Sequence, residues 1–446
     1  MTDDLLTPLD LAFWCLESPE HPMHLGALGV FTADSVTAAQ HAAELLAARS
    51  AAVPGLRMRI RGVWVPVGGA VREAAQDFSP QDHVHLAPAT TDYHGAAGKL
   101  MERPLARERP PWEAHVLPHS DGTSFAVLFK FHHALADGLR ALTLAAGLMD
   151  PPPASPTPAA RKARAAERAP EPTRGWKLPN PFDLPGVVRR RMGEAGRALD
   201  IGAAVVGANW DVRTSPALTA PPTGTRRTAG VVLDLDDVHR IRKKAGGTVN
   251  DVLLAVVAGA LRRWLDERGD GSEGVAPRAL IPVSRRRPRT SHPQGNQLSG
   301  YLIRLPVGDP DPLGRLRTVR TAMDRNKDAG TQRGAGAIAL LADHVAPLGH
   351  RLGGPVMAQA ARLLFDVLVT SVPLPSLGLK LAGCPLIEVY PFAPLAQGQS
   401  LAVAISTYRG HVHYGLVADG EAIPDLGRLA RALQDEITEL TAAAAE

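Results

Sequence analysis

The amino-acid sequence predicts an α/β protein of two domains joined by a linker. Its 446 residues are enough for two hydrophobic cores, and 45% hydrophobic with 21% charged residues is an ordinary globular composition. Short β-prone apolar segments alternate with segments whose apolar residues recur at helical spacing. A proline-rich segment, 151–158, interrupts this pattern and cannot form a core. We therefore expect domains over 1–150 and 226–446, with a Pro/Arg-rich linker over 151–225.

Charge and cysteine content narrow the class of protein. The 49 Lys and Arg residues nearly balance the 45 Asp and Glu residues, so a net charge of +4 predicts no nucleic-acid partner. The two cysteines, Cys15 and Cys384, exclude a disulfide framework and a cysteine-rich zinc site, and they fit a reducing cytoplasm. The N-terminus is acidic where a secretory signal would be basic. The longest apolar run, 252–261, is too short to span a bilayer, so we expect a cytoplasmic protein, at most peripheral on a membrane.

The most informative stretch of the chain is a turn that carries two adjacent histidines. Residues 124–130 are apolar and β-prone and predict a buried strand, whereas 139–146 space their leucines like a helix. Between them lie His132, His133 and, four residues later, Asp137, with Gly138 at the bend. A core strand therefore delivers both histidines into a tight turn.

The two histidines are expected to have different roles. Adjacent side chains at a strand end point in opposite directions, so one histidine can face a cleft while the other packs inward. Imidazole titrates near neutrality and can take a proton from a substrate hydroxyl, amine or thiol. Asp137 either orients the imidazole or braces the loop through a buried arginine, and its helix-entry position favours bracing. A metal site would need a third nearby ligand, which the sequence lacks, so we predict no metal.

The elements of the N-terminal domain follow from apolar periodicity. Trp112 is expected to be a packing anchor because its neighbours are apolar. His83 and His85 are expected on a half-exposed strand face rather than as ligands. The remaining expectations are a helix from Pro8, a strand over 24–31, a helix over 37–50, a strand pair within 57–66, a strand over 83–86, a helix over 95–101 and a strand over 114–117.

Residue composition and apolar patterns also predict the character of the linker and the elements of the C-terminal domain. Basic residues interleaved with Trp176 and Phe182 suit either a solvated linker or docking on an anionic lipid surface. Thr248 or Asn250 is expected to cap a helix that runs to 264. The further expectations are strands over 231–235, 302–305, 384–391, 401–408 and 411–418, strand ends at 281–284 and 369–375, and helices over 338–348, 356–368 and 425–442.

The motif His132-His133-x-x-x-Asp137-Gly138 resembles the signature of the CoA-dependent acyltransferase superfamily, which includes chloramphenicol acetyltransferases and peptide-synthetase condensation domains. Other segments resemble its branch of bacterial wax ester synthase/diacylglycerol acyltransferases. This sequence departs from that branch at two positions, with Ser371 where the family has an Asn and Leu374 where it has a Gly. These differences leave the role of the loop 369–375 open. The matching segments are Pro8-x-Asp10, Pro22-Met23-His24, Asn250-Asp251, Gly295-Asn296-x-x-Ser299 and Thr370-x-Val372-Pro373.

The resemblance implies an architecture and a set of site residues. It implies two chloramphenicol-acetyltransferase-like α/β (α+β) sandwiches, with mixed sheets backed by helices and the site at their interface. His133 would be the base, supported by His132, Asp137 and Gly138, while Asn250 either caps its helix or holds the oxyanion. Arginines suit the phosphates of coenzyme A, although a solvated loop explains the basic run 285–289 equally well. The implied coenzyme-binding residues are Arg285, Arg287, Asn296, Ser299 and Thr370.

The implied activity is transfer of a long-chain acyl group from acyl-CoA to diacylglycerol, and possibly to a fatty alcohol, with no permanently bound cofactor and no metal. One alternative is a condensation-type acyltransferase of natural-product assembly, against which the chain carries no carrier domain and has Leu139 where an aromatic is common. Another alternative is a catalytically silent lipid-binding protein on the same fold, against which both histidines and Asp137 are retained.

Overall fold

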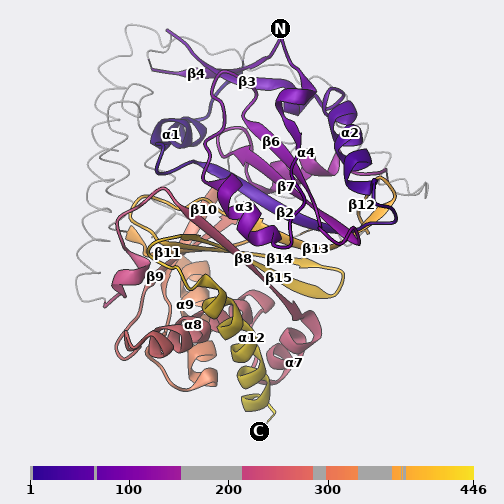
Figure 1. Cartoon of the computed structure of the whole chain (residues 1–446). Helices are drawn as coiled ribbons and strands as arrows, with labels where there is room; N and C mark the ends of the chain where they lie inside the picture. Colours follow the sequence, from indigo (N-terminus) through magenta and orange to yellow (C-terminus); the bar gives the residue numbers. More distant parts are fainter. Residues whose placement is uncertain are drawn as a thin grey trace, which may run out of the picture.

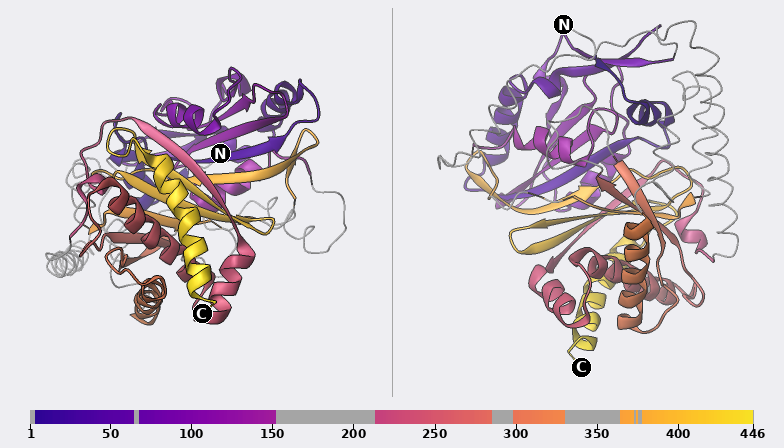
Figure 2. Two further views of the ribbon diagram at one scale, coloured as in Figure 1. Left: turned by 60° about the horizontal axis from the view of Figure 1, so that its bottom comes forward. Right: turned by 180° about the vertical axis from the view of Figure 1, so that it is seen from behind.

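The computed structural model describes residues 4–64, 68–151, 213–284, 298–329, 364–372, 374 and 378–445. Within these residues two six-stranded mixed sheets lie face to face, with helices covering their outer sides (Figure 1). A smaller three-stranded sheet lies at the end of the N-terminal half that is farthest from the C-terminal helices (Figures 1 and 2). The predicted α/β class with mixed sheets backed by helices is confirmed.

The first sheet has the order β12-β13-β2-β7-β6-β5, and β5 is parallel to β6 while the other pairs are antiparallel. Its central strand β7 alternates between two cores. Phe125, Val127 and Phe129 pack beneath helices α2 and α4, whereas Ala126 and Leu128 face the second sheet. The elements are β2 (His24–Thr32), α2 (Ala38–Ser50), β5 (Val84–Leu86), β6 (Trp112–Pro118), β7 (Ser124–His132), α4 (Gly138–Ala146), β12 (Lys380–Leu381) and β13 (Cys384–Phe392).

The second sheet has the order β10-β9-β11-β14-β15-β8. Its strand β11 runs parallel to both of its neighbours, β9 and β14. In the described part of the chain, helices α7, α8, α9 and α12 cover the face that points away from the first sheet (Figure 1). The central one, α8, is buried along most of its length, which explains its nearly unbroken apolar sequence. The elements are β8 (Arg226–Asp234), α7 (Leu235–Ala245), α8 (Val249–Arg268), β9 (Arg278–Ser284), β10 (Leu298–Arg304), α9 (Pro312–Ala329), β11 (Val367–Ser371), β14 (Leu401–Tyr408), β15 (His411–Asp419) and α12 (Leu426–Ala443).

The two large sheets share an apolar core, and two glycines allow them to approach closely. Gly230 of β8 and Gly415 of β15 are direct cross-strand partners. A Cβ on Gly415 would overlap the carbonyl of Pro391, and one on Gly230 would overlap the ring of Tyr390. Both obstacles belong to β13, so only residues without a side chain let this strand lie against the second sheet.

The strands β12 and β13 come from the C-terminal part of the chain but complete the first sheet. Asp150, the last residue before the predicted linker, holds this returning hairpin. Its carboxylate accepts hydrogen bonds from the backbone N–H of Gly383 (2.7 Å) and Ala382 (3.2 Å), and it pairs with Arg49 at 2.8 Å. The hairpin therefore fastens the C-terminal part of the chain to the end of the N-terminal one.

The third sheet, with the order β1-β4-β3, and two further helices complete the N-terminal half. Helix α1 begins with a Thr7 cap, whose hydroxyl accepts from the backbone N–H of Asp10. The elements are β1 (Asp4–Leu5), α1 (Pro8–Leu16), β3 (Met58–Gly62), β4 (Ala70–Ala74), α3 (Tyr93–Met101) and the short 3₁₀ helices Pro54–Arg57, Pro80–Asp82 and Pro216–Leu218.

Several local predictions are corrected by the structure. The partner of β3 lies at Ala70–Ala74 rather than within 57–66. His83 is 2% exposed rather than half-exposed, because its ring stacks on Trp112 and hydrogen-bonds the Trp112 carbonyl at 2.9 Å. The helix predicted over 356–368 overruns β11, since Val367 already belongs to the strand. The prediction that Thr248 or Asn250 caps α8 is confirmed for Thr248, which forms a reciprocal capping box with Asp251.

Other predictions are confirmed or lie outside the described residues. Trp112 is fully buried, and its indole N–H donates to the Leu56 carbonyl at 2.7 Å. Residues 152–212 of the predicted linker 151–225, with Trp176 and Phe182, lie outside the described residues, and so does the predicted helix over 338–348. No single helix in the described part is long and apolar enough to cross a membrane, although the bent pair α7 and α8 passes that test jointly, by length and composition only.

Two buried histidines between the large sheets are expected to make the folded protein less stable at acidic pH. Burial lowers the pKa of His94 and of His413 to about 4, and Tyr390 lies between them at ring distances of 4.8 and 5.9 Å. The unfolded chain binds protons near pH 6.5, so the stability that each neutral histidine contributes is complete above that pH and is lost as pH falls towards 4. For each, we expect a loss of about 2 kcal/mol between pH 7 and pH 5.

This expectation is checked by denaturant unfolding of the wild type and of His413→Leu at pH 7 and pH 5. The acid-induced loss of unfolding free energy should be smaller in the variant by about 2 kcal/mol. His411→Leu is the matched control, because His411 lies on the same strand but is exposed. An equal acid-induced loss in the wild type and His413→Leu would contradict the assignment.

Candidate active site

The histidine turn lies at the end of β7 and is held by backbone hydrogen bonds. His132 is the last residue of the strand and is 1% exposed, whereas His133 is half-buried. The backbone N–H of His133 donates to the Met23 carbonyl at 2.8 Å, and Leu135 N–H donates to the His132 carbonyl at 2.8 Å. Nδ1 of His132 accepts from Ala134 N–H at 3.0 Å, so in the neutral ring the hydrogen is on Nε2.

One face of helix α1 holds this turn. The side chains at positions 10, 13, 14 and 17 recur at helical spacing and all point to it or to its support. Phe13 stacks on His133 with ring centroids 4.1 Å apart, and Trp14 meets His132 edge-on at 4.9 Å. A carboxylate oxygen of Glu17, the residue that ends the helix, lies 3.5 Å from Nε2 of His132. The two histidines therefore contact different neighbours, as expected for adjacent residues at a strand end.

The environment of His133 favours its neutral form. Burial lowers the pKa of His133 below its usual value, and the nearby Asp137 charge offsets this only in part. A neutral imidazole can accept a proton, and the stacked Phe13 ring restricts the orientation of the His133 ring. His133 thus has the protonation state that a general base needs at neutral pH.

Asp137 and Gly138 shape the far side of the turn. The Asp137 carboxylate caps α4 by accepting from the backbone N–H of Arg140 at 2.8 Å, as expected for a helix-entry aspartate. A Cβ on Gly138 would lie 3.2 Å from Cγ2 of Val372, which follows β11 of the second sheet. The turn is therefore packed directly against the second sheet, and the glycine permits this approach.

A buried ion pair supports the turn from below. Arg72 of β4 pairs with Asp10 of α1 at 2.6 Å, and their side chains are 2% and 0% exposed. The same guanidinium nitrogen donates to the Ala134 carbonyl at 2.7 Å. Arg72 thus joins the third sheet, helix α1 and the histidine turn, and it satisfies a carbonyl that would otherwise be buried without a partner.

Glu17 is a site residue that the sequence analysis missed. Its carboxylate contacts His132, accepts from Met23 N–H at 3.2 Å and pairs with Arg107 at 3.1 Å. Burial raises the pKa of Glu17, but the hydrogen bond and charge of His132 and the Arg107 charge outweigh it, so the pKa lies below its usual value. The available signal was its spacing, seven residues after Asp10 on the same helical face.

Glu17→Gln is expected to lower kcat about tenfold for the acyl transfer that the motif resemblance implies, because it removes a charge-assisted contact worth about 1.5 kcal/mol from His132, the neighbour of the candidate base His133. KM for acyl-CoA should stay unchanged, since Glu17 positions His132 and is not expected to touch the donor. Steady-state kinetics check this, with Glu439→Gln as the control because Glu439 pairs with Arg263 far from the turn. Unchanged kcat in Glu17→Gln would refute the positioning role.

Of the other predicted site residues, three lie in described helices or strands and three lie outside the described residues. Asn250 lies half-buried in the first turn of α8 and makes no hydrogen bond to the histidine turn within the described residues. Thr370 is half-buried in β11, two residues before the Val372 that touches Gly138. Ser299 lies in β10, opposite Val283. Arg285, Arg287 and Asn296 lie outside the described residues.

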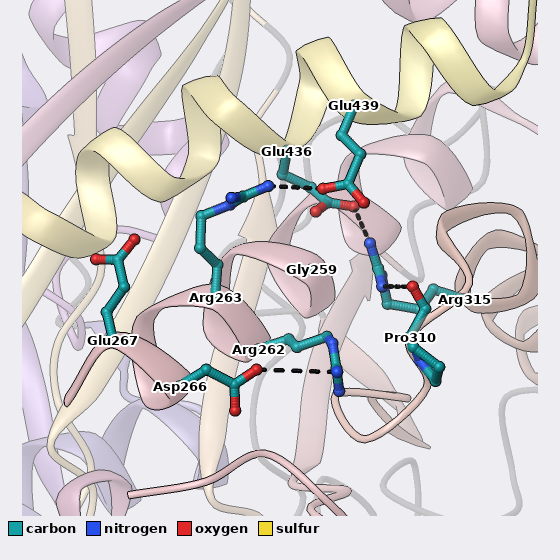
Figure 3. Close-up of a pocket in the computed structure, with 9 residues that line it drawn as sticks. All are labelled: Gly259, Arg262, Arg263, Asp266, Glu267, Pro310, Arg315, Glu436 and Glu439. Carbon is teal, nitrogen blue, oxygen red and sulfur yellow. Dashed lines mark hydrogen bonds and ion pairs between the residues drawn. The ribbon is translucent and has the colours of Figure 1, made fainter. Parts of the chain in front are cut away.

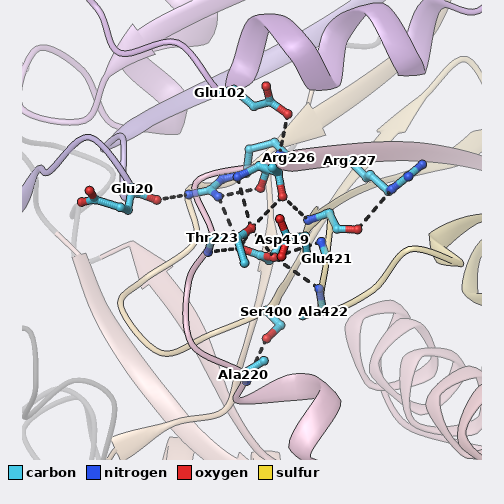
Figure 4. Close-up of polar contacts among 12 residues, drawn as sticks. Glu20, Glu102, Ala220, Thr223, Arg226, Arg227, Ser400, Asp419, Glu421 and Ala422 are labelled. Carbon is cyan, nitrogen blue, oxygen red and sulfur yellow. Dashed lines mark hydrogen bonds and ion pairs between the residues drawn. The ribbon is translucent and has the colours of Figure 1, made fainter.

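Arg226, the first residue of β8, connects the second sheet to the segment that leads into the site (Figure 4). Its guanidinium donates to the Glu20 carbonyl at 2.7 Å, and its backbone N–H donates to the Glu102 carboxylate at 2.9 Å. Asp419 lies 3.9 Å from the guanidinium and accepts from Thr223 N–H at 2.8 Å. Glu20 lies between Glu17 and Met23, so the second half of the chain contacts the segment that holds both histidines.

A separate pocket of about 420 Å³ opens between α8, α9 and α12 (Figure 3). Its arginines are already paired with acids: Arg315 with Glu436 at 2.6 Å and Arg263 with Glu439 at 2.6 Å. Lipid and drug-sized ligands favour mostly apolar pockets, so this polar hollow is a poor candidate for an acyl chain. Among the described residues, no group of three or more His, Cys, Asp or Glu side chains is placed to hold a metal ion.

Comparisons with known proteins agree with this geometry. Residues 6–253 match the model of the wax ester synthase/diacylglycerol acyltransferase catalytic domain, and residues 294–441 match the C-terminal domain of the same family. A probable diacylglycerol O-acyltransferase of Mycobacterium tuberculosis, tgs1, is 31% identical over 77% of this chain and 74% of the relative. A second one, tgs2, is 28% identical over 98% of both chains.

Solved structures show the same fold. The wax ester synthase/diacylglycerol acyltransferase of Marinobacter aquaeolei VT8 matches with a TM-score of 0.71 at 22% identity, over 99% of this chain and 100% of that one. The first condensation domain of the CDA synthetase matches with a TM-score of 0.58 at 16% identity, over 100% and 97%. The family models cover both halves of the sequence, including the histidine turn. The chain therefore belongs to the wax ester synthase/diacylglycerol acyltransferase family.

Proposed function

We propose that this chain transfers a long-chain acyl group from acyl-CoA to the free hydroxyl of diacylglycerol, with a fatty alcohol as a second acceptor. The observation that carries the proposal is the neutral, half-buried His133, held on the turn by Phe13 and by the Met23 carbonyl. Family membership supports the substrate class, because the curated relatives are named as diacylglycerol O-acyltransferases.

In the proposed mechanism His133 is a general base and then a general acid. It takes the proton from the acceptor hydroxyl as that oxygen attacks the thioester carbonyl, and a tetrahedral oxyanion forms. The carbon–sulfur bond then breaks, the carbonyl re-forms, and the coenzyme A thiolate takes the proton from His133. Glu17 and Ala134 fix His132 on the opposite side of the turn, so it is available for positioning rather than proton transfer.

The remaining roles are proposals that rest on the family resemblance. Asn250 is proposed to donate to the oxyanion, an effect worth roughly 3 kcal/mol when a donor is well aimed. Thr370 is favoured among the coenzyme-binding residues, because its strand ends at Ser371, one residue before the Val372 that lies against Gly138. Arg285, Arg287, Asn296 and Ser299 are proposed to bind the phosphates and pantetheine arm of acyl-CoA.

We place the reaction at a lipid surface that faces the cytoplasm, on a membrane or a lipid droplet. Diacylglycerol and long-chain alcohols partition out of water, so a protein that acylates them works at an interface. Neither Cys15 nor Cys384 forms a disulfide, as is usual in a reducing compartment.

The direct test is release of free thiol from palmitoyl-CoA, with diacylglycerol and hexadecanol offered in parallel and the ester product identified by mass. Transfer to diacylglycerol is the expected result, and the two initial rates rank the acceptors. Thiol release without ester would indicate hydrolysis, and no release with either acceptor would overturn the proposal.

A further inference from the structure

The three-stranded sheet β1-β4-β3 packs against the histidine turn. Ile60 of β3 and Ala70 of β4 share an apolar cluster with Leu11, Trp14 and the turn residue Ala134. Arg72, the cross-strand partner of Ile60, hydrogen-bonds the Ala134 carbonyl. One face of this small sheet therefore contacts the candidate active site.

Strand β3 is the edge of this sheet and carries an excess of positive charge. Arg59 and Arg61 flank Ile60 in β3, so along the extended strand their side chains point away from the face that carries Ile60, while Arg57 is the last residue of the 3₁₀ helix just before the strand. Arg57 is exposed, and the side chains of Arg59 and Arg61 are 33% and 49% exposed. Glu73 pairs with both Arg59 and Arg61, which leaves a net positive edge of three arginines against one carboxylate.

Trp64 lies two residues beyond the end of β3 and is 92% exposed. The other tryptophans of the described chain, Trp14, Trp112 and Trp264, are at most 7% exposed. Burial of an indole ring from water is strongly favourable, so a fully exposed tryptophan is energetically costly. Tryptophan is also the side chain best suited to the boundary between lipid headgroups and acyl chains. An exposed tryptophan at the end of an arginine-bearing edge strand has the charge and polarity pattern of a lipid-docking element.

We propose that β3 and Trp64 dock this chain on an anionic phospholipid surface. Trp64 enters the interface, while Arg57 and Arg61 face the lipid phosphates. The opposite face of the same sheet contacts Ala134, so docking places the histidine turn one sheet away from the phase that holds the acceptor lipid. This last step rests on the proposed acyl transfer, whereas the docking itself does not.

The test measures binding of the full chain to vesicles of phosphatidylcholine with and without phosphatidylglycerol. Trp64→Ala is expected to weaken binding to the anionic vesicles at least about tenfold, and Arg57→Gln with Arg61→Gln should reduce the preference for phosphatidylglycerol. Val36→Ser is the matched control, because Val36 is 90% exposed outside this sheet, and its binding should match the wild type. Wild-type binding by Trp64→Ala would overturn the proposal.

A second readout is independent of affinity. Brominated lipids should quench tryptophan fluorescence of the wild type, and the quenching should fall in Trp64→Phe.

Activity separates this inference from the proposed function: Trp64→Ala should lose transfer to vesicle-borne diacylglycerol but keep transfer to a water-soluble short-chain diacylglycerol. Docking without any transfer activity would refute the proposed function alone, whereas normal transfer with Trp64-independent docking would refute this inference alone.

Discussion

His133→Ala is expected to lower acyl transfer from palmitoyl-CoA to diacylglycerol by about 10²–10⁴-fold, the usual contribution of a general base. The imidazole is the titratable group that the turn holds against Phe13 in its neutral form. The neighbouring His132 should not replace it, because its Nδ1 accepts from Ala134 N–H and its Nε2 faces the Glu17 carboxylate. Thiol release and ester formation, measured under saturating acceptor, check the expected loss.

The pH dependence of the wild type gives an independent signature of the same group. A base must be neutral to act, so kcat/KM should rise as pH increases through the pKa of His133 and stay level above it. Burial lowers that pKa below the usual histidine value, so the rise should be complete at or below neutral pH. His411→Ala is the control variant, since His411 is exposed on β15, and it should keep the wild-type rate. Turnover that survives in His133→Ala would assign the base to another residue.

Local sequence patterns predicted the elements that present the site. The β7 strand, the α4 helix and their connecting turn follow from alternation, leucine spacing and Gly138, and Asp137 caps the helix as its position suggests. β14 over 401–408 has the predicted bounds, because its apolar run is short and ends at turn residues. The helix predicted over 356–368 overran Val367, since a continuous apolar run fits a buried strand as well as a helix.

Contacts between residues distant in sequence could not be predicted in this way. Arg72 meets Asp10 across 62 positions, and its value to the turn depends on the three-dimensional path of β4. The return of β13 to the first sheet is equally non-local and depends on the glycine pair Gly230 and Gly415. His83 was misjudged because burial beneath Trp112 depends on a neighbouring strand, not on its own alternation. The sequence therefore predicted the reactive turn but not the residues that hold it.

Arg72→Ala is expected to lower the free energy of unfolding by about 3–5 kcal/mol, because it leaves the Asp10 carboxylate buried without its partner. It should also lower kcat of the protein that remains folded, since the Ala134 carbonyl loses a hydrogen bond and the histidine turn is freed. Denaturant unfolding and active-site-normalised kinetics at a temperature below the transition separate the two effects.

The chain offers a matched control for this second effect. Arg315 of α9 and Glu436 of α12 form another buried pair at 2.6 Å, with both side chains 2% exposed, but this pair lies among the helices on the outer side of the second sheet. Arg315→Ala should cost a comparable amount of stability and leave kcat of the folded enzyme unchanged. If both variants lost stability but neither lost kcat, Arg72 would be a structural residue only. A loss of kcat confined to Arg72→Ala would place the Asp10–Arg72–Ala134 contact among the determinants of the active conformation, because this contact joins a buried charge to the turn that carries His133.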